Sequence, residues 1–338
     1  MTRKATSQDV ADLAGVSRSA VSLVLNGRAA GNIAPAKQVA ILAAAAELNY
    51  TPNAVALSLR TRRTRTIGCV APTRDLAAAA GSILQAALTA ATAAGYLLLI
   101  MDSGAESGAE AGAVEQLRDR QVDGFLLVSG ALDQHRLPEA LGAASVLANR
   151  TDPDRRVVSL VADDEEAAFS AAELLLGYGH RILALVTDGT PAETAQFAIG
   201  VRRALTGAGL APPRLIAGGA ELRAGWNATR ELLAHPNPPT AIVASGERTA
   251  VGVALAAAAA GVQIPADLSV VTIGTITGLA AGLPTALTSM QRPNREIGAL
   301  AIRLLLQQLA SLEPILPQEI KVRYGLAERD SVAVPRRA

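Results

Sequence analysis

A short run of polar residues near the start of the chain has the chemistry needed to contact DNA. Ser17, Arg18 and Ser19 stand where a helix is predicted to begin, and Ser22 and Asn26 follow along it. An arginine can donate two hydrogen bonds to a guanine edge, which is worth about 1–3 kcal/mol of discrimination. Serine and asparagine are short donors suited to phosphate oxygens. The run predicts a DNA-reading surface, although Ser17 and Asn26 could also simply cap the helix.

The helices that would position this run are predicted from capping residues and apolar spacing. Thr6 and Asp9 form a capping box that begins a first helix, and Gly15 ends it. Ser17 begins the second helix and Pro35 begins the third. Two helices joined by a short turn with glycine fit a helix-turn-helix. The residues predicted to form its small core are Val10, Leu13, Ala14, Val21, Val24, Leu25, Ile41, Leu42, Ala45 and Leu48.

Residues 9–22, 24–27 and 46–54 together resemble the DNA-binding headpiece of the lactose-repressor (LacI/GalR) family. The resemblance implies that the second helix enters the major groove and that a homodimer binds a palindromic operator. Two departures stand out. Leu23 occupies a position that is usually basic or polar in the family, so we expect it to pack against a thymine methyl group on an unusual operator. The turn at residues 28–32 is about two residues longer than usual.

The segment that follows, residues 53–60, resembles the hinge helix of the same family. The resemblance implies that Leu59 wedges between base steps in the minor groove, which kinks DNA. Leu59 could alternatively be a buried residue of an ordinary linker helix, and the arginines that follow could be merely solvated. The full set of predicted DNA contacts is Thr6, Ser17, Arg18, Ser19, Ser22, Leu23, Asn26, Asn53, Leu57, Leu59 and Arg60.

Charge is distributed unevenly along the chain. The net charge of the 338 residues is +1, but residues 1–65 hold nine basic and three acidic side chains, which leaves −5 on the remainder. A basic end on an acidic body is the distribution expected of a protein whose one end meets a polyphosphate. Double-stranded DNA is therefore the predicted macromolecular partner.

Short apolar runs alternate with amphipathic segments throughout the rest of the chain, which predicts α/β architecture with parallel sheets in two lobes. The predicted strands are residues 67–71, 96–101, 125–129, 145–148, 157–161, 182–187, 215–217, 241–244, 269–273 and 287–290. Further likenesses to the family along this body imply the two-lobed fold of periplasmic sugar-binding proteins. Ligands of such sheets lie beyond the carboxyl ends of the strands, here in a cleft between the lobes.

These patterns give a predicted domain organisation. Residues 1–52 form the helix-turn-helix headpiece, residues 53–65 the hinge helix and basic linker, and residues 66–338 an effector-binding and dimerisation domain. The first lobe of that domain takes in about 66–162 and 292–320. The second lobe takes in about 163–291 and 321–338.

The predicted effector cleft departs from the family at four residues in three places. By the resemblance, Phe197 replaces an arginine, Gly246 and Glu247 replace an Asn-Asp pair, and Gly274 replaces an aspartate. Asp163 and Trp226 remain near the expected cleft, although Trp226 could equally be a core residue. A buried site without polar anchors cannot offset the desolvation of sugar hydroxyls. We therefore expect an uncommon, less polar effector, which stays unidentified, or none.

Other function classes find little support in the sequence. Three histidines, the single Cys69 and no phosphate-binding glycine motif argue against an enzyme, a cofactor or a metal site. For His180 we expect a structural capping role. Without a signal peptide or a long apolar segment, we expect a cytoplasmic protein that does not enter a membrane. The main alternative is an effector-independent or architectural DNA-binding protein.

Overall fold

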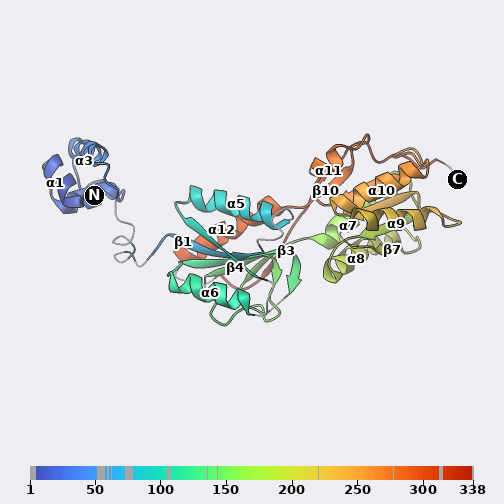
Figure 1. Ribbon diagram of the computed structural model, residues 1–338, viewed down its shortest axis with the longest axis horizontal. Helices are drawn as coiled ribbons and strands as arrows, with labels where there is room; N and C mark the ends of the chain where they lie inside the picture. Colours follow the sequence, from blue (N-terminus) through green and yellow to red (C-terminus); the bar gives the residue numbers. More distant parts are fainter. Residues whose placement is uncertain are drawn as a thin grey trace. The chain divides into compact units, whose positions relative to one another are not determined.

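The computed structural model describes residues 5–51, 58, 61, 63–72, 79–104, 108–134, 136–142, 144–219, 221–276, 278–311 and 315–336. The chain divides into two compact units, Met1–Arg65 and Thr66–Ala338 (Figure 1). The boundary coincides with the start of the first strand. Each unit has its own hydrophobic core.

Three helices make up the described part of the first unit: α1 (Ser7–Ala14), α2 (Arg18–Leu25) and α3 (Pro35–Glu47). The Thr6 hydroxyl accepts from the Asp9 amide, and the Asp9 carboxylate accepts from the Thr6 amide at 2.7 Å, so the predicted capping box is present. Gly15 ends α1 with a left-handed φ of 65°, a conformation that glycine adopts without a steric penalty. Only two residues, Val16 and Ser17, then separate Gly15 from α2.

The core of this unit differs from the prediction at two leucines. Leu13 is 49% exposed and Leu42 is 53% exposed, although both were expected inside. At about 100° per residue, Val10, Ala11 and Ala14 centre the buried face of α1, which turns Leu13 away from it. The same geometry puts Leu42 beside, rather than on, the buried face of α3. The buried core residues are Val10, Ala11, Ala20, Val21, Val24, Ala29, Ile41, Ala44 and Ala45.

The first lobe of the second unit is built on a six-stranded parallel sheet in the order β11-β5-β4-β3-β1-β2. Helices α5 (Ala79–Ala93) and α12 (Asn294–Ala310) cover one face, and α6 (Ala109–Asp119) covers the other (Figure 1). The strands are β1 (Thr66–Ala71), β2 (Leu97–Asp102), β3 (Gly124–Gln134), β4 (Ser145–Thr151), β5 (Val158–Ala162) and β11 (Glu319–Val322).

The second lobe repeats this plan with the strand order β12-β10-β9-β8-β6-β7. Helices α7 (Asp164–Gly177) and α8 (Pro191–Gly207) pack on one face, and α9 (Leu222–Leu233) and α10 (Glu247–Ala259) pack on the other; α11 (Gly278–Ala281) is a short helix beside α10. The strands are β6 (Leu183–Thr187), β7 (Arg214–Ala217), β8 (Ala241–Ser245), β9 (Ser269–Ile273), β10 (Thr288–Gln291) and β12 (Gly325–Ala327).

Two features differ from the sequence expectations. Strand β12 runs antiparallel to β10, so the second sheet is mixed rather than wholly parallel. Strand β11 pairs with β5 up to Val322, so Lys321 and Val322 belong to the first lobe rather than the second. The chain passes from one sheet to the other after β5, after β10 and after β11.

Close packing of α7 against α8 depends on a glycine. A Cβ atom at Gly200 of α8 would lie 2.1 Å from the carbonyl oxygen of Glu165 on α7, so no other residue fits without moving the helices apart. The contact lets two small-residue helices bury a shared core that contains Ala168, Ala172 and Val201. It also fixes the first turn of α7 next to α8, where charged residues of the interlobe junction lie.

His180 has a structural role, but it does not cap a helix as predicted. His180 follows α7 and precedes β6 in the chain, and it is buried. Its Nδ1 atom lies 2.9 Å from the Thr240 hydroxyl, and its Nε2 atom lies 2.9 Å from both the Ser269 hydroxyl and the Ala333 carbonyl. The ring thus ties the beginnings of β8 and β9 to the C-terminal segment. Burial lowers the pKa of His180, which favours the neutral ring.

This lowered pKa predicts a pH-dependent stability. The unfolded chain takes up a proton at the ordinary histidine pKa of 6.5, whereas the folded chain resists protonation until a lower pH. The free energy of unfolding should therefore fall as the pH drops below about 6.5, by at most about 1.4 kcal/mol per pH unit from this group. Urea denaturation at a series of pH values should show this fall in the wild type and lose that component in His180→Gln. The exposed His235, changed to Gln, serves as the control and should leave the profile unaltered.

Candidate nucleic-acid interface and interlobe junction

Helix α2 has one buried face and one face that points outward. Ala20, Val21 and Val24 are buried in the core of the first unit. At about 100° per residue, the five residues predicted to contact DNA from this helix fall within an arc of about 140° on the other side. These residues are Arg18, Ser19, Ser22, Leu23 and Asn26, of which Arg18 and Ser19 are exposed and the others half-buried.

The short polar residues around α2 are engaged in capping. The Ser17 hydroxyl accepts from the Ala20 amide at 3.2 Å and so caps the N-terminus of the helix. Asn26 ends the helix, and its side-chain amide donates to the Ser22 carbonyl and lies 3.2 Å from the Ser22 hydroxyl. Thr6 is exposed at the N-cap of α1. These caps leave Arg18 and Ser19 at the exposed first turn of α2, where a helix N-terminus favours phosphate oxygens.

Asn53, Leu57, Leu59 and Arg60, the predicted contacts of the hinge, lie outside the described residues. Their roles stay predictions.

A buried guanidinium lies at the junction between the two lobes. Arg292 follows β10, and its side chain is only 14% exposed. Its Nη2 atom lies 3.0 Å from the Asn149 Oδ1 atom of the first lobe and 3.0 Å from the Glu193 Oε1 atom of the second lobe. The same nitrogen is 3.7 Å from the Asp164 Oδ2 atom. Arg292 therefore connects β4 of one lobe with α7 and α8 of the other.

The neighbours of Arg292 determine which groups are charged. Burial opposes the charge of the guanidinium, but Asp164 and Glu193 raise the pKa of Arg292 above its ordinary value, so it stays charged. Burial raises the pKa of Asp164, an effect that Arg292 opposes. Burial also raises the pKa of Tyr324 well above its ordinary value, so the phenol stays protonated and donates to Asp164 Oδ1.

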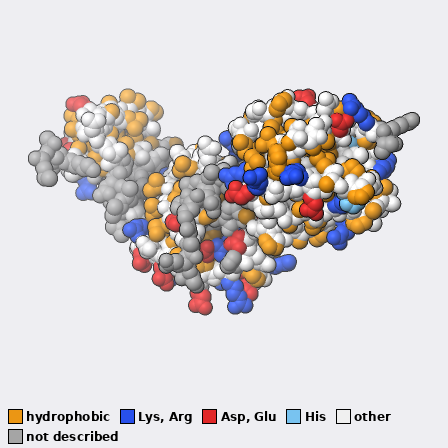
Figure 2. Space-filling model, turned by 45° about the vertical axis from the view of Figure 1, so that its right-hand side comes forward, with side chains coloured by type: hydrophobic (Ala, Val, Ile, Leu, Met, Phe, Trp, Pro, Cys, Tyr) orange, Lys and Arg blue, Asp and Glu red, His pale blue; other side chains and the backbone are white. Residues whose placement is uncertain are grey.

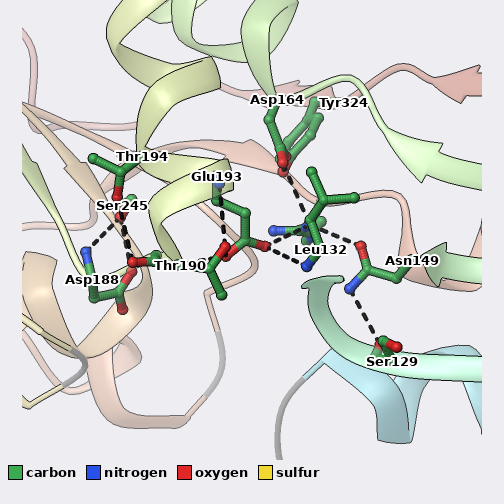
Figure 3. Close-up of polar contacts among 12 residues, drawn as sticks. Ser129, Leu132, Asn149, Asp164, Asp188, Thr190, Glu193, Thr194, Ser245 and Tyr324 are labelled. Carbon is green, nitrogen blue, oxygen red and sulfur yellow. Dashed lines mark hydrogen bonds and ion pairs between the residues drawn. The ribbon is translucent and has the colours of Figure 1, made fainter. Parts of the chain in front are cut away.

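Further hydrogen bonds extend the junction into both lobes (Figure 3). Glu193 Oε1 accepts from the Leu132 amide of β3 at 3.1 Å, and Glu193 Oε2 accepts from the Thr190 amide at 3.1 Å. The Asn149 side-chain amide donates to the Ser129 carbonyl at 3.2 Å. Because Glu193 is buried at the start of α8, its carboxylate both caps that helix and bonds to the first lobe.

The predicted cleft residues gather in part at the carboxyl ends of the second sheet. Gly246 follows β8 and Gly274 follows β9, and a Cβ atom on Gly274 would lie 3.5 Å from the Gly246 Cα atom. Glu247 begins α10, and its Oε1 atom accepts from the Ala280 amide at 2.9 Å. Phe197 is instead 3% exposed and packs in the core beneath α7 and α8.

The other two predicted cleft residues occupy helices. Asp163 caps α7 by accepting from the Glu166 amide at 3.5 Å, and its carboxylate lies 3.7 Å from Lys321 Nζ. Trp226 is half-buried on α9, which packs against α10.

Asp188 takes up the space above Gly246. The Asp188 carboxylate accepts from the Ser245 hydroxyl at 2.8 Å, and a Cβ atom on Gly246 would lie 2.0 Å from Asp188 Oδ2. Burial raises the pKa of Asp188, which the Ser245 hydrogen bond opposes. The junction is thus more polar than the replaced residues suggested, and most of its polar groups bond to one another (Figure 3), although Asp164 Oδ2 and Arg292 Nε are buried without a hydrogen-bond partner.

Sequence reasoning missed most of these junction residues. Arg292, Asn149, Glu193 and Tyr324 were not singled out. The signal that could have found Arg292 and Asn149 is positional: each is a polar residue that follows a predicted strand, at the edge where the two lobes meet.

The comparisons with known proteins agree with this arrangement. Residues 6–53 match the family described as bacterial regulatory proteins, lacI family, and residues 172–332 match the periplasmic binding protein-like domain. Catabolite control protein A of Priestia megaterium is 32% identical over 313 residues, which cover 89% of this chain and 91% of that protein. The chain belongs to the lacI family of bacterial regulatory proteins.

Other relatives extend the likeness over nearly the full length. The HTH-type transcriptional repressor PurR of Erwinia tasmaniensis is 30% identical over 348 residues, with 97% of each chain covered. The solved lac repressor dimer bound to operator and the anti-inducer ONPF has a TM-score of 0.74 and 24% identity, with 98% of this chain and 100% of that chain covered, which shows the shared fold. This lacI-family member is therefore a DNA-binding regulator of transcription and not an enzyme.

The described residues contain neither a metal-binding cluster nor a membrane-spanning helix. Across those ranges, no group of three or more His, Cys, Asp or Glu side chains is placed to hold a metal ion. None of the helices in the same ranges is long and apolar enough to cross a membrane. The thiol of Cys69 is buried, and burial raises its pKa to about 12, so it is unreactive.

The geometry at Gly246 predicts that this position tolerates no side chain. Its φ of 79° and ψ of 147° lie in a region that is essentially restricted to glycine, and Asp188 fills the adjoining space. Gly246→Ala should lower the free energy of unfolding by about 2–5 kcal/mol, measured by urea denaturation. Gly261→Ala is the control, because Gly261 also has a positive φ of 73° but open space around it. A loss no larger than that of the control would contradict the steric role of Asp188.

Proposed function

We propose that this protein represses transcription by binding a palindromic operator as a homodimer, with α2 of each copy in the major groove. The observation that supports this most directly is the outward face of α2, which carries Arg18 and Ser19 at an exposed helix N-terminus. That placement is the one through which recognition helices contact base edges. Since operator DNA is in the cytoplasm of a bacterium, we place its action there.

On the proposed operator, the residues of α2 divide into two roles. Arg18 and Ser19 contact bases, with the guanidinium on a guanine and Leu23 on a thymine methyl group. Ser17, Ser22 and Asn26, together with Thr6, contact phosphates. In the free protein Ser17, Ser22 and Asn26 take part in helix capping, and a capping hydroxyl or amide can still approach a phosphate oxygen.

A second copy of the chain is part of the proposal for two reasons. The solved lac repressor with the same fold is a dimer on its operator. The second unit also exposes large apolar side chains on α5, β2, α10 and α11, and Figure 2 shows a group of hydrophobic side chains on the second lobe. A second copy would cover such side chains, which are Leu88, Leu97, Ile100, Leu255 and Leu279. Asn53, Leu57, Leu59 and Arg60 remain the proposed hinge contacts.

The junction supports a regulator that does not respond to an ordinary neutral sugar. Arg292 is bonded to Glu193 and Asn149, Asp164 to Tyr324, and Asp188 to Ser245. A sugar hydroxyl could enter here only by displacing one partner of the Arg292–Glu193 ion pair, in which both groups are charged, with a hydrogen bond in which only one group is charged. An architectural DNA-binding protein is the second candidate, favoured by the same paired junction, because such a protein needs no effector.

The two candidates differ in the DNA that they occupy. Sequencing of the DNA fragments bound in cells should recover a small number of sites that share one palindrome. Broad coverage of AT-rich DNA would instead identify an architectural protein and contradict the proposal.

Arg18→Ala should weaken binding to the recovered palindrome about 5- to 150-fold, because it removes about 1–3 kcal/mol of base recognition. The loss should be smaller on an operator altered at the base pair that Arg18 contacts, and fluorescence anisotropy with labelled duplexes can measure both. Arg118→Ala, an exposed arginine of α6, is the control and should bind like the wild type. Equal affinity of Arg18→Ala and the wild type would remove Arg18 from the proposed interface.

A further inference from the structure

The three chain segments that join the two lobes are bonded to one another. Asp164 is the first residue of α7, directly after the crossing that follows β5; Arg292 lies between β10 and α12, and Tyr324 between β11 and β12. Tyr324 donates to Asp164 Oδ1, and Arg292 Nη2 lies 3.7 Å from Asp164 Oδ2. Any rotation of one lobe against the other must bend these segments, so contacts among them restrict that rotation directly.

The same cluster also reaches into the body of each lobe. Arg292 contacts Asn149 on β4 of the first lobe, and Glu193 on α8 of the second lobe. Glu193 in turn accepts from the Leu132 amide on β3 of the first lobe. Figure 3 shows the Glu193 and Asn149 side chains directed toward the same region from opposite lobes. Two independent links, one through Arg292 and one through Leu132, therefore end on a single carboxylate.

We infer that Arg292, Glu193, Asp164, Asn149 and Tyr324 form a clasp that holds the two lobes in one arrangement without any ligand. In this arrangement each charged group of the clasp has a partner from another segment. Opening the lobes would separate Arg292 from Asn149, which removes a hydrogen bond from the guanidinium, or from Glu193, which leaves the carboxylate without its charged partner.

The clasp stabilises one arrangement of the two lobes, as a bound effector that contacts both lobes would otherwise do. A ligand that bridges two lobes stabilises the closed arrangement only through contacts to both of them. Here the contacts that bridge the lobes come from the chain itself, so the arrangement of the lobes does not require a ligand. Any effect of the clasp on operator binding rests on the proposed function, whereas the claim that the clasp holds the lobes in one arrangement does not.

The clasp can be tested by measuring distances between the lobes with double electron–electron resonance. Glu115 on α6 and Glu231 on α9 are exposed and lie on different lobes, so Glu115→Cys with Glu231→Cys provides a pair of spin labels. Cys69 is buried and stays unlabelled. Doubly labelled chain is diluted with unlabelled chain, so that distances within one copy dominate. The ligand-free protein should give one narrow distance distribution.

Arg292→Met should broaden that distribution or give it a second maximum. Glu193→Gln keeps the size of the side chain but removes its charge, and it should broaden the distribution in the same direction; it carries the test if Arg292→Met does not fold. Arg203→Met is the matched control, because Arg203 also pairs with two carboxylates, Glu165 and Glu166, but entirely within the second lobe. The control should keep the narrow distribution.

Wild-type distances in the folded Arg292 or Glu193 variant would overturn the clasp, as would a broad distribution in the ligand-free wild type. Operator binding by the same samples separates the two proposals. If the wild type binds no specific DNA but the variants still broaden the distribution, the proposed function fails and the clasp stands. If the wild type binds its operator and the distances do not respond, the clasp fails and the function stands.

Discussion

A charged guanidinium removed from water requires partners, and in this protein that requirement shapes the junction between the lobes. Arg292 is 14% exposed, and its partners come from β4, α7 and α8. Leaving one member of such a buried pair without its partner destabilises a protein by about 3–5 kcal/mol. The start of α7, the start of α8 and the end of β4 must therefore meet at one place. The two lobes are held together by this electrostatic constraint in addition to the three chain segments that connect them.

The DNA-binding unit is stabilised differently, since it buries only a small core. Its helices depend on local devices: the Thr6–Asp9 capping box, the left-handed Gly15 and the Ser17 cap. These devices set where α1 ends and where α2 begins, and the core shared with α3 holds α2 in place. The outward arc with Arg18 and Ser19 is thereby presented to DNA by a handful of neighbouring residues, and this is why it could be recognised in the sequence.

Local signals explain what the sequence predicted well. Ten strands of the second unit were located from apolar runs: most are buried on both faces of their sheet, and the edge strands β2 and β7, although partly exposed, still consist mainly of apolar residues. Strands β11 and β12 were missed because Glu319–Val322 and Gly325–Ala327 are short, and the alternating or exposed residues of these edge strands give no apolar run. Leu13 and Leu42 were misplaced because apolar type alone was taken as burial, although the alanines Ala11 and Ala44 are the residues that fit between the helices. The clasp was missed for another reason: Arg292 and Asn149 are 143 residues apart, and no local pattern encodes such a contact.

The central claim is that side chains of the protein, rather than a ligand, hold the two lobes in one arrangement. Calorimetric titration of the purified protein with a panel of neutral hexoses and pentoses tests this claim most directly. The clasp predicts no saturable heat at micromolar sugar, because a neutral hydroxyl that displaced Glu193 from Arg292 would leave the buried carboxylate without its charged partner. Micromolar binding of any simple hexose or pentose would contradict the account.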